Sequence, residues 1–189
     1  MKKLLFLFVV IAYGSLTYGQ KDMTGSYLEA VQTTYQPGQT VTLDLIMYNG
    51  SPDNEWTISA DIQFPAGVTV NGAIDFNLNP PILDRYLVYG GATGDGVLVQ
   101  WLDPDGGWGE FFGNSYAYAT VNVTIDPGFT GDLNLDYTIR GDIWGSVPHE
   151  VYGTYTLAPP PVPLSNWALG IGLLLISGFI VVRYRRRLA

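Results

Sequence analysis

Apolar and polar residues alternate with a period of two through most of the chain between residues 41 and 157. Val41, Leu43 and Leu45, for example, share one face of an extended segment, with Thr42 and Asp44 on the other. This alternation is typical of strands with one face in a core. It predicts strands at 41–47, 56–64, 117–125, 133–139 and 151–157, and further strands at 27–34, 86–89 and 96–102.

Turn signals separate these segments, and no helical period of useful length occurs between them. Pro37-Gly38, Pro65-Ala66-Gly67 and Pro127-Gly128 are examples. Residues 71–84 look irregular and contain Pro80-Pro81, so we expect a long connection there. Seven to nine antiparallel strands at this spacing predict an all-β fold, an immunoglobulin-like β-sandwich with a single core.

Both ends of the chain have a different pattern. Residues 167–182 carry no charge and would form a helix of about 24 Å, against a bilayer core of ~30 Å. Four arginines follow at once in the tail 183–189, namely Arg183, Arg185, Arg186 and Arg187. The one-sided positive charge predicts a single transmembrane helix at 167–182 with a basic cytoplasmic tail, rather than a buried core helix.

The N-terminus has the layout of a secretory signal peptide. Lys2 and Lys3 precede the short apolar run 4–12, and a small-residue cleavage site ends at Gly19. An uncleaved anchor is the alternative. We therefore divide the chain into a signal peptide (1–19), an ectodomain (20–158), a Pro-rich linker with a sorting motif (159–166), the helix and the tail.

Charge is segregated along the chain. All 17 acidic residues lie between Asp22 and Glu150, with only Lys21, Arg85 and Arg140 to balance them, so the ectodomain has a net charge of −14. This excludes nucleic-acid binding through charge, and it suits either divalent cations or a plain solvated surface. The chain has no cysteine, which excludes disulfides, lipid anchoring through an N-terminal cysteine and thiol chemistry.

Two segments of the ectodomain resemble a family of bacterial surface modules. They are residues 35–43, YQPGQTVTL, and residues 64–68, FPAGV, with Asn49 between them. They are similar to the opening strands of immunoglobulin-like modules of the DUF11/CARDB kind. The resemblance covers about a third of the domain and implies an extracellular module for spacing, adhesion or binding.

The end of the chain resembles the C-terminal sorting signals of the IPTL-CTERM/PEP-CTERM type. Pro163, Leu164, Ser165 and Trp167 match the family pattern, the family's Thr is missing, and Asn166 stands in place of its Glu. The resemblance implies a Gram-negative envelope protein, cut near this motif by an exosortase-type enzyme and transferred to a surface anchor. A simple single-span anchor is the alternative.

No catalytic constellation stands out. His149 is the only histidine, and no nucleophile elbow accompanies it. Paired carboxylates for glycoside hydrolysis would have to come from Glu29, Glu55, Glu110 and Glu150, on a chain with no recognisable cleft segment. We expect a protein that is not an enzyme, with a small surface hydrolase as a minor alternative.

Aromatic residues in and beside glycine-rich segments are candidate ligand contacts. Flat rings there can stack on sugars or anchor a protein partner, or they can simply fill the open ends of a sandwich. The candidates are Trp101, Trp108, Phe111, Phe112 and Trp144.

Asp103, Asp105 and Glu110 lie within one glycine-rich segment that follows a predicted strand. Carboxylates on a tightly turning chain are what calcium requires, although the EF-hand spacing is absent and a solvated acidic turn is the alternative. No other cofactor is indicated. Taken together, the sequence predicts a non-enzymatic, envelope-anchored module for adhesion, binding or spacing, with an unidentified surface protein or glycan as its partner; a carbohydrate-binding module is the alternative.

Overall fold

The computed structural model describes residues 22–52, 54–144, 147–160 and 166–188. They form two units, one ending at Pro159 and the other beginning at Pro160. The first unit is built of strands, which are β1 (Tyr27–Ala30), β2 (Thr40–Asn49), β3 (Thr57–Gln63), β4 (Val68–Ala73), β5 (Phe76–Leu78), β6 (Tyr86–Tyr89), β7 (Gly94–Asp95), β8 (Leu98–Leu102), β9 (Ser115–Ile125), β10 (Leu133–Gly141) and β11 (Glu150–Leu157).

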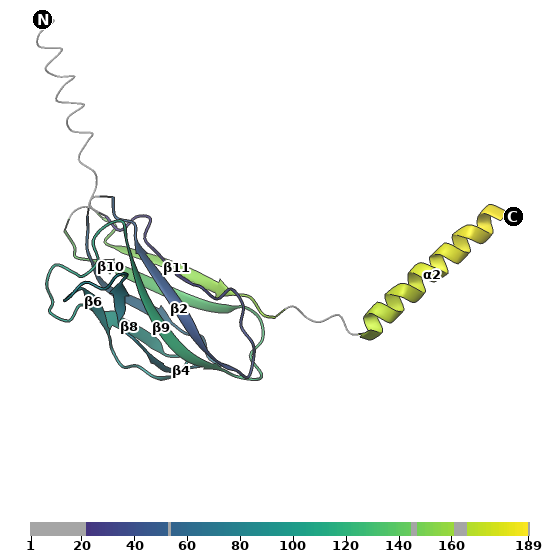
Figure 1. Ribbon diagram of the computed structural model, residues 1–189, viewed down its shortest axis with the longest axis horizontal. Helices are drawn as coiled ribbons and strands as arrows, with labels where there is room; N and C mark the ends of the chain where they lie inside the picture. Colours follow the sequence, from purple (N-terminus) through teal and green to yellow (C-terminus); the bar gives the residue numbers. More distant parts are fainter. Residues whose placement is uncertain (1–21, 53, 145–146, 161–165, 189) are drawn as a thin grey trace, which may run out of the picture. The chain divides into compact units, whose positions relative to one another are not determined.

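The strands form an antiparallel sandwich of the immunoglobulin-like class (Figure 1). One layer contains β1, β2 and β9, and β4 and β5 extend it beside β9, with β7 paired to β4. The other layer runs in the order β6, β8, β3, β10, β11. The β5–β6 pair connects the two layers, since β5 pairs with β9 and β6 with β8. The predicted fold class is confirmed.

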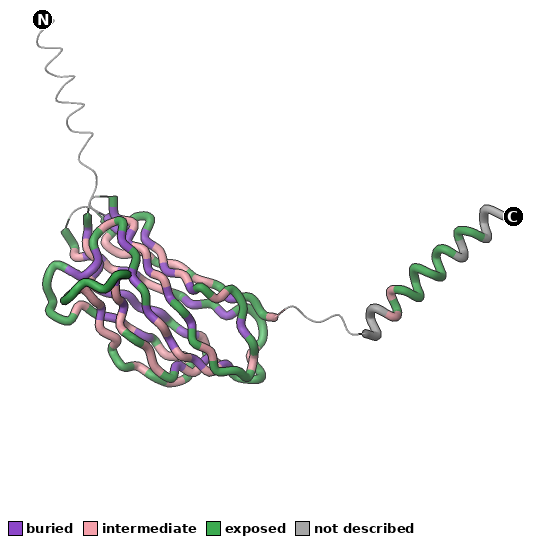
Figure 2. The backbone as a smooth tube through the Cα atoms, in the orientation of Figure 1, coloured by how far each residue is buried: buried purple, intermediate pink, exposed green. Residues whose placement is uncertain are grey.

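The alternating residues meet between the layers as the period of two predicts. Along β9 buried and more exposed positions alternate for the whole strand, and Figure 2 shows the same alternation on its neighbours. Trp101 of β8 and Phe76 of β5 are among the largest fully buried side chains. The described buried apolar residues all fall between Met23 and Leu157, so this unit holds its own complete core.

Several strands differ in extent from the sequence-based prediction. The five principal strands lie where the alternation placed them, but β1 ends at Ala30 and not at Thr34. Residues 71–84 were expected to be an irregular connection. This is wrong for the first part, because β4 reaches Ala73 and β5 follows it, whereas residues 79–84 contain no strand. Both pair with β9, and the β4 register shifts between Val70 and Gly72. The bulge in β4 breaks its alternation, and β5 is too short for alternation to be detected.

The two ends of the sandwich differ in what emerges from them. The segments after β2, β8 and β10 leave from the same end. The ends of β8 and β10 pair with the start of β3, and Asn49 at the end of β2 bonds to the carbonyl groups of Glu55 and Phe111 there. We call this the loop end. The chain leaves at Ala158 from the opposite end, where Leu157 pairs with Leu133. The loop end and Ala158 therefore lie at opposite ends of the sandwich.

The second unit contains one helix, α2 (Asn166–Leu188). The helix expected at 167–182 lies within it. Among the described residues, no helix has the length and apolar character needed to cross a bilayer. The predicted signal peptide at 1–19 and the motif residues Pro163, Leu164 and Ser165 lie outside the described residues, so these assignments remain predictions.

Candidate functional site

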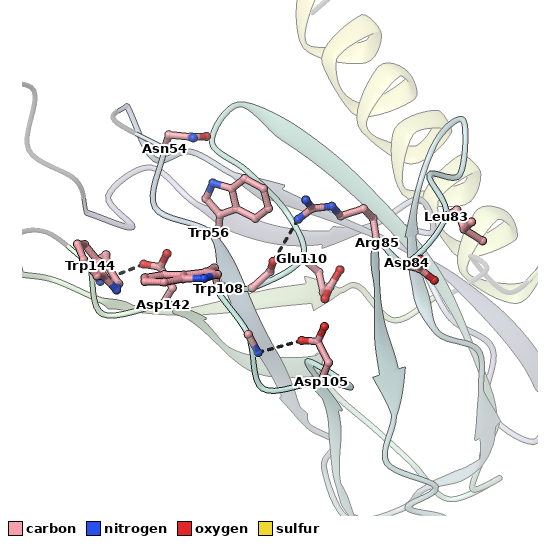
Figure 3. A pocket seen from close by; sticks show the side chains of 12 residues that line it. Asn54, Trp56, Leu83, Asp84, Arg85, Asp105, Trp108, Glu110, Asp142 and Trp144 are labelled. Atoms are coloured by element: carbon pink, nitrogen blue, oxygen red, sulfur yellow. Dashed lines mark hydrogen bonds between the residues drawn. The ribbon is translucent and has the colours of Figure 1, made fainter.

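A pocket of about 710 Å³ opens at the loop end of the sandwich (Figure 3). Its walls come from the segments that follow β2, β5, β8 and β10, which the topology brings to one place. The lining combines aromatic rings with carboxylates and one guanidinium group. The residues are Asn54, Trp56, Leu83, Asp84, Arg85, Asp105, Gly107, Trp108, Gly109, Glu110, Asp142 and Trp144.

Two tryptophans from different segments form an exposed aromatic pair at the pocket. The rings of Trp108 and Trp144 lie 4.9 Å apart between centroids, tilted by 59°. Their exposed fractions are 63% and 56%, which are large for indole side chains. The amide of Trp144 donates a hydrogen bond to Asp142 Oδ1 at 3.0 Å, which helps to hold this segment in place. The pair thus presents apolar ring surface to solvent.

A third tryptophan, Trp56, lies in the same pocket and carries a cation above its ring. The guanidinium carbon of Arg85 lies 4.2 Å from the Trp56 ring centroid, a cation–π contact. Arg85 also donates from an NH1 group to the carbonyl oxygen of Gly109 at 3.4 Å. Arg85 is thereby directed towards the segment that carries Trp108, as Figure 3 shows.

Three carboxylates converge beside these rings. Asp103, Asp105 and Glu110 each place one oxygen within 4.8 Å of the others. Glu110 is only 4% exposed. Burial raises the pKa of the Glu110 carboxyl, Asp103 and Asp105 raise it further, and Arg85 opposes them. The three residues that the sequence grouped are therefore close together in the structure. That they bind a metal ion stays a prediction.

The aromatic candidates divide into two groups. Trp108 and Trp144 line the pocket, as expected of ligand contacts. Trp101 and Phe111 do not qualify, because both are fully buried and belong to the core. Phe112 is exposed and its ring centroid lies 6.2 Å from that of Trp56, next to the pocket but not in its lining.

Sequence reasoning missed Trp56 and Arg85. Trp56 begins an alternating stretch and was therefore assigned to the buried face of a strand, but β3 starts one residue later, at Thr57. Arg85 is one of only three basic residues in a domain with 17 acidic ones. That scarcity was the available signal, since an isolated cation among many acids is a candidate for a specific role.

The residues weighed for catalysis are used structurally. His149 Nδ1 lies 2.8 Å from Oε1 of the fully buried Glu55. Burial raises the pKa of the Glu55 carboxyl, against the opposing contribution of His149. Glu150 forms an ion pair with Arg140 at 2.9 Å. Of the four glutamates that were candidates for hydrolysis, only Glu110 lines the pocket.

The remaining site predictions concern the C-terminal unit. Asn166 and Trp167 of the sorting motif form the start of α2, and Arg183, Arg185, Arg186 and Arg187 lie near its end. The helix was expected to end at residue 182 with the arginines after it, but α2 continues to Leu188, so the basic cluster forms its last turns. Their roles in sorting and in membrane topology stay predictions.

Comparisons with known proteins find similarity among solved structures only. No family model matches the chain, and no curated protein matches its sequence. The sixth cohesin of Acetivibrio cellulolyticus scaffoldin B, crystallised with a Cel5 dockerin mutant, matches at 16% identity and a TM-score of 0.46, over 72% of this chain and 100% of that one. The cohesin module of a Clostridium perfringens family 33 glycoside hydrolase gives 14% and 0.46, over 71% and 94% of the two chains. The major pilin subunit of Bacillus cereus gives 6% and 0.47, over 72% and 40%. Identities this low, with TM-scores below 0.5, transfer no function to this chain.

Proposed function

We propose that the β-sandwich is a non-enzymatic binding module that takes a saccharide in the pocket at its loop end. The observation that carries the proposal is the exposed pair of Trp108 and Trp144 at a pocket of about 710 Å³. Large apolar rings in contact with water cost free energy unless a ligand covers them. Their position at a concave site favours ligand contact over the structural role considered from the sequence.

The polar part of the lining supports a saccharide in particular. Sugars offer apolar C–H faces that stack on aromatic rings, together with hydroxyl groups that donate to carboxylates. Asp84, Asp105 and Asp142 supply acceptors around the pocket, and Arg85 supplies donors. A pocket of this size is within the range of small-ligand sites. This combination of exposed rings and polar side chains favours a saccharide over a protein as the ligand.

A glycan array tests the proposal. Residues 20–158 should bind a subset of bacterial and plant polysaccharides, and Trp108→Ala and Trp144→Ala should each weaken binding by about tenfold or more, because each removes a stacking surface. The affinities can be compared by calorimetry with the best glycan. Tyr118→Ala, an exposed aromatic of β9 outside the pocket, is the matched control.

Three results would count against the proposal. Equal binding by the wild type and both tryptophan variants would remove the pocket as the binding site. Absence of any glycan binding would favour the protein-adhesion alternative, in which the same tryptophans and Arg85 would anchor a partner. Release of shortened glycan products would show a hydrolase.

We propose further that the module is displayed on a bacterial envelope by its C-terminal tail. The uncharged stretch 167–182 and the arginines after it support this proposal. The exit of the chain at Ala158, at the opposite end from the pocket, is compatible with a site that faces outward.

Deleting residues 163–189 tests the display. The truncated protein should leave the membrane fraction and be found in the periplasm or the medium. Replacing Arg183, Arg185, Arg186 and Arg187 with Gln, with the apolar stretch intact, tests whether the basic cluster sets the topology. Retention of the truncated protein in membranes would contradict the anchor.

A further inference from the structure

Three carboxylate oxygens among the described residues are buried without a hydrogen-bond partner, and two of them belong to neighbouring acids; the third, Glu55 Oε2, is on a carboxyl whose other oxygen pairs with His149. Glu110 Oε2 and Asp103 Oδ2 are shielded from solvent and accept no hydrogen bond within the described part of the chain. A buried carboxylate oxygen without a donor has lost its hydration without replacement, which is costly. Both oxygens belong to the group of three acids that lie within 4.8 Å of one another.

Among the described residues, no cationic side chain forms an ion pair with this cluster. The ion pairs among the described residues are Arg140 with Asp61, Arg140 with Glu150, and His149 with Glu55. Arg85 is the nearest candidate, but it stacks on Trp56 and donates to the Gly109 carbonyl. Three carboxylates in one place therefore lack a counter-charge within ion-pair distance.

The local chain uses one oxygen of each aspartate and leaves the other available. Asp103 Oδ1 accepts hydrogen bonds from the amides of Asp105 and Gly106, at 3.0 and 3.1 Å. Asp105 Oδ1 accepts from the amide of Gly107 at 2.9 Å. These bonds turn the chain tightly, with Gly106 at a φ of 69°. The turn fixes both aspartate side chains and brings them beside the buried Glu110.

We propose that Asp103, Asp105 and Glu110 bind one calcium ion, with the unpartnered Glu110 Oε2 and Asp103 Oδ2 among its ligands. The donor set consists of oxygen only, which suits a hard cation. Calcium accepts irregular geometry with backbone carbonyls and waters as further ligands, whereas magnesium requires a near-ideal octahedron. The ion would replace the missing counter-charge. It would also fix the segment that carries Trp108, so its effect reaches the pocket.

Thermal unfolding of residues 20–158, which hold the complete described core, tests the calcium site. Calcium chloride at a hundredfold excess over the dissociation constant should raise Tm by roughly 5–10 °C, relative to sodium chloride at equal ionic strength. Magnesium at the same concentration should raise it by much less. Calorimetry with calcium chloride should give one site.

Glu110→Gln and Asp103→Asn should abolish the calcium response. Glu110→Gln should also raise Tm in calcium-free buffer, because it removes an uncompensated buried charge; this gain distinguishes the loss of a ligand from misfolding. Asp84→Asn is the matched control, since Asp84 is an exposed pocket acid outside the cluster and has a φ of 58°, which Asn also tolerates. It should keep the full calcium shift.

Two results would overturn the site. One is a wild-type Tm that calcium does not change. The other is a shift of equal size in the wild type and Glu110→Gln, which would mean that calcium only screens the general negative charge. Neither result depends on a glycan, so the calcium site and the saccharide proposal can fail independently.

Discussion

Trp101→Ala should lower the free energy of unfolding by about 3–5 kcal/mol, a large share of the ~5–15 kcal/mol that stabilises a typical domain. Trp101 lies in the middle of the core with no exposed surface, and its ring contacts Phe76 edge-on at 5.0 Å between centroids. Its indole N–H donates to the carbonyl oxygen of Ile74 at 2.9 Å. The truncation would leave a large cavity and an unpaired carbonyl. Urea denaturation followed by circular dichroism measures the loss.

Trp108→Ala is the matched control for this experiment. Trp108 is largely exposed, so its removal should change stability by no more than about 0.5 kcal/mol. The two substitutions, seven residues apart, should thus have different effects: Trp101→Ala should lower stability, and Trp108→Ala should weaken ligand binding. A stability loss of similar size in both variants would contradict the assignment of Trp101 to the core and Trp108 to the site.

Asn49→Asp should cost about 3 kcal/mol or more at neutral pH. The Asn49 side chain is almost fully buried, and its Nδ2 group lies within hydrogen-bond distance of the carbonyl oxygens of Glu55 and Phe111, both at 2.8 Å, and of Thr57 Oγ1 at 3.1 Å. Its Oδ1 accepts from the amide of Ser51. A carboxylate would place a negative charge against both carbonyl oxygens. The Glu55 carbonyl would lose the Asn49 donor, while the Phe111 carbonyl would keep only the Thr57 amide. Chemical denaturation at pH 7 measures the effect.

The pH dependence of this variant gives a second readout. The introduced carboxyl would be buried against acceptors, which raises its pKa in the folded state. The penalty should therefore shrink as the pH falls towards 4.5, where the carboxyl binds a proton and can donate again. Asn134→Asp is the control, because Asn134 is exposed on β10 and its Oδ1 only accepts from Thr156 Oγ1, as an aspartate can. A penalty equal to that of the control would contradict the role of Asn49.

Most of the fold could be predicted from the sequence because it depends on a pattern repeated over many residues. The long strands β2, β9, β10 and β11 each contain enough alternating positions for the period of two to be clear. β5 has only three residues and forms because it pairs with β6 and β9. β7 has only two residues and forms because it pairs with β4. Such pairing is a long-range property that a local pattern does not contain.

The site could be predicted only in part, for a related reason. The acidic cluster lies within eight residues of one segment, so its members could be grouped from the sequence. The aromatic pocket instead collects Trp56, Trp108 and Trp144 from three segments that meet only because β2, β8 and β10 end together. Trp101 and Phe111 lie in or beside the same glycine-rich segment as the exposed Trp108, so the local sequence did not distinguish them from it. Their burial follows from the pairing of their segments with β3.

The placement of the pocket and the chain exit at opposite ends also determines how the domain carries mechanical load. A force between a bound ligand and a held C-terminus would pull β11 along its own axis, from Leu157 against the loop end. The hydrogen bonds between β11 and β10 lie perpendicular to that axis, and the register from Leu133–Leu157 to Arg140–Glu150 contains eight residue pairs. They would bear the force together, in shear, rather than open one after another. Ala158 adds backbone bonds to Thr33 and Tyr35 at the point where the force enters. A domain held at Ala158 and pulled at the loop end would thus be loaded along its strands.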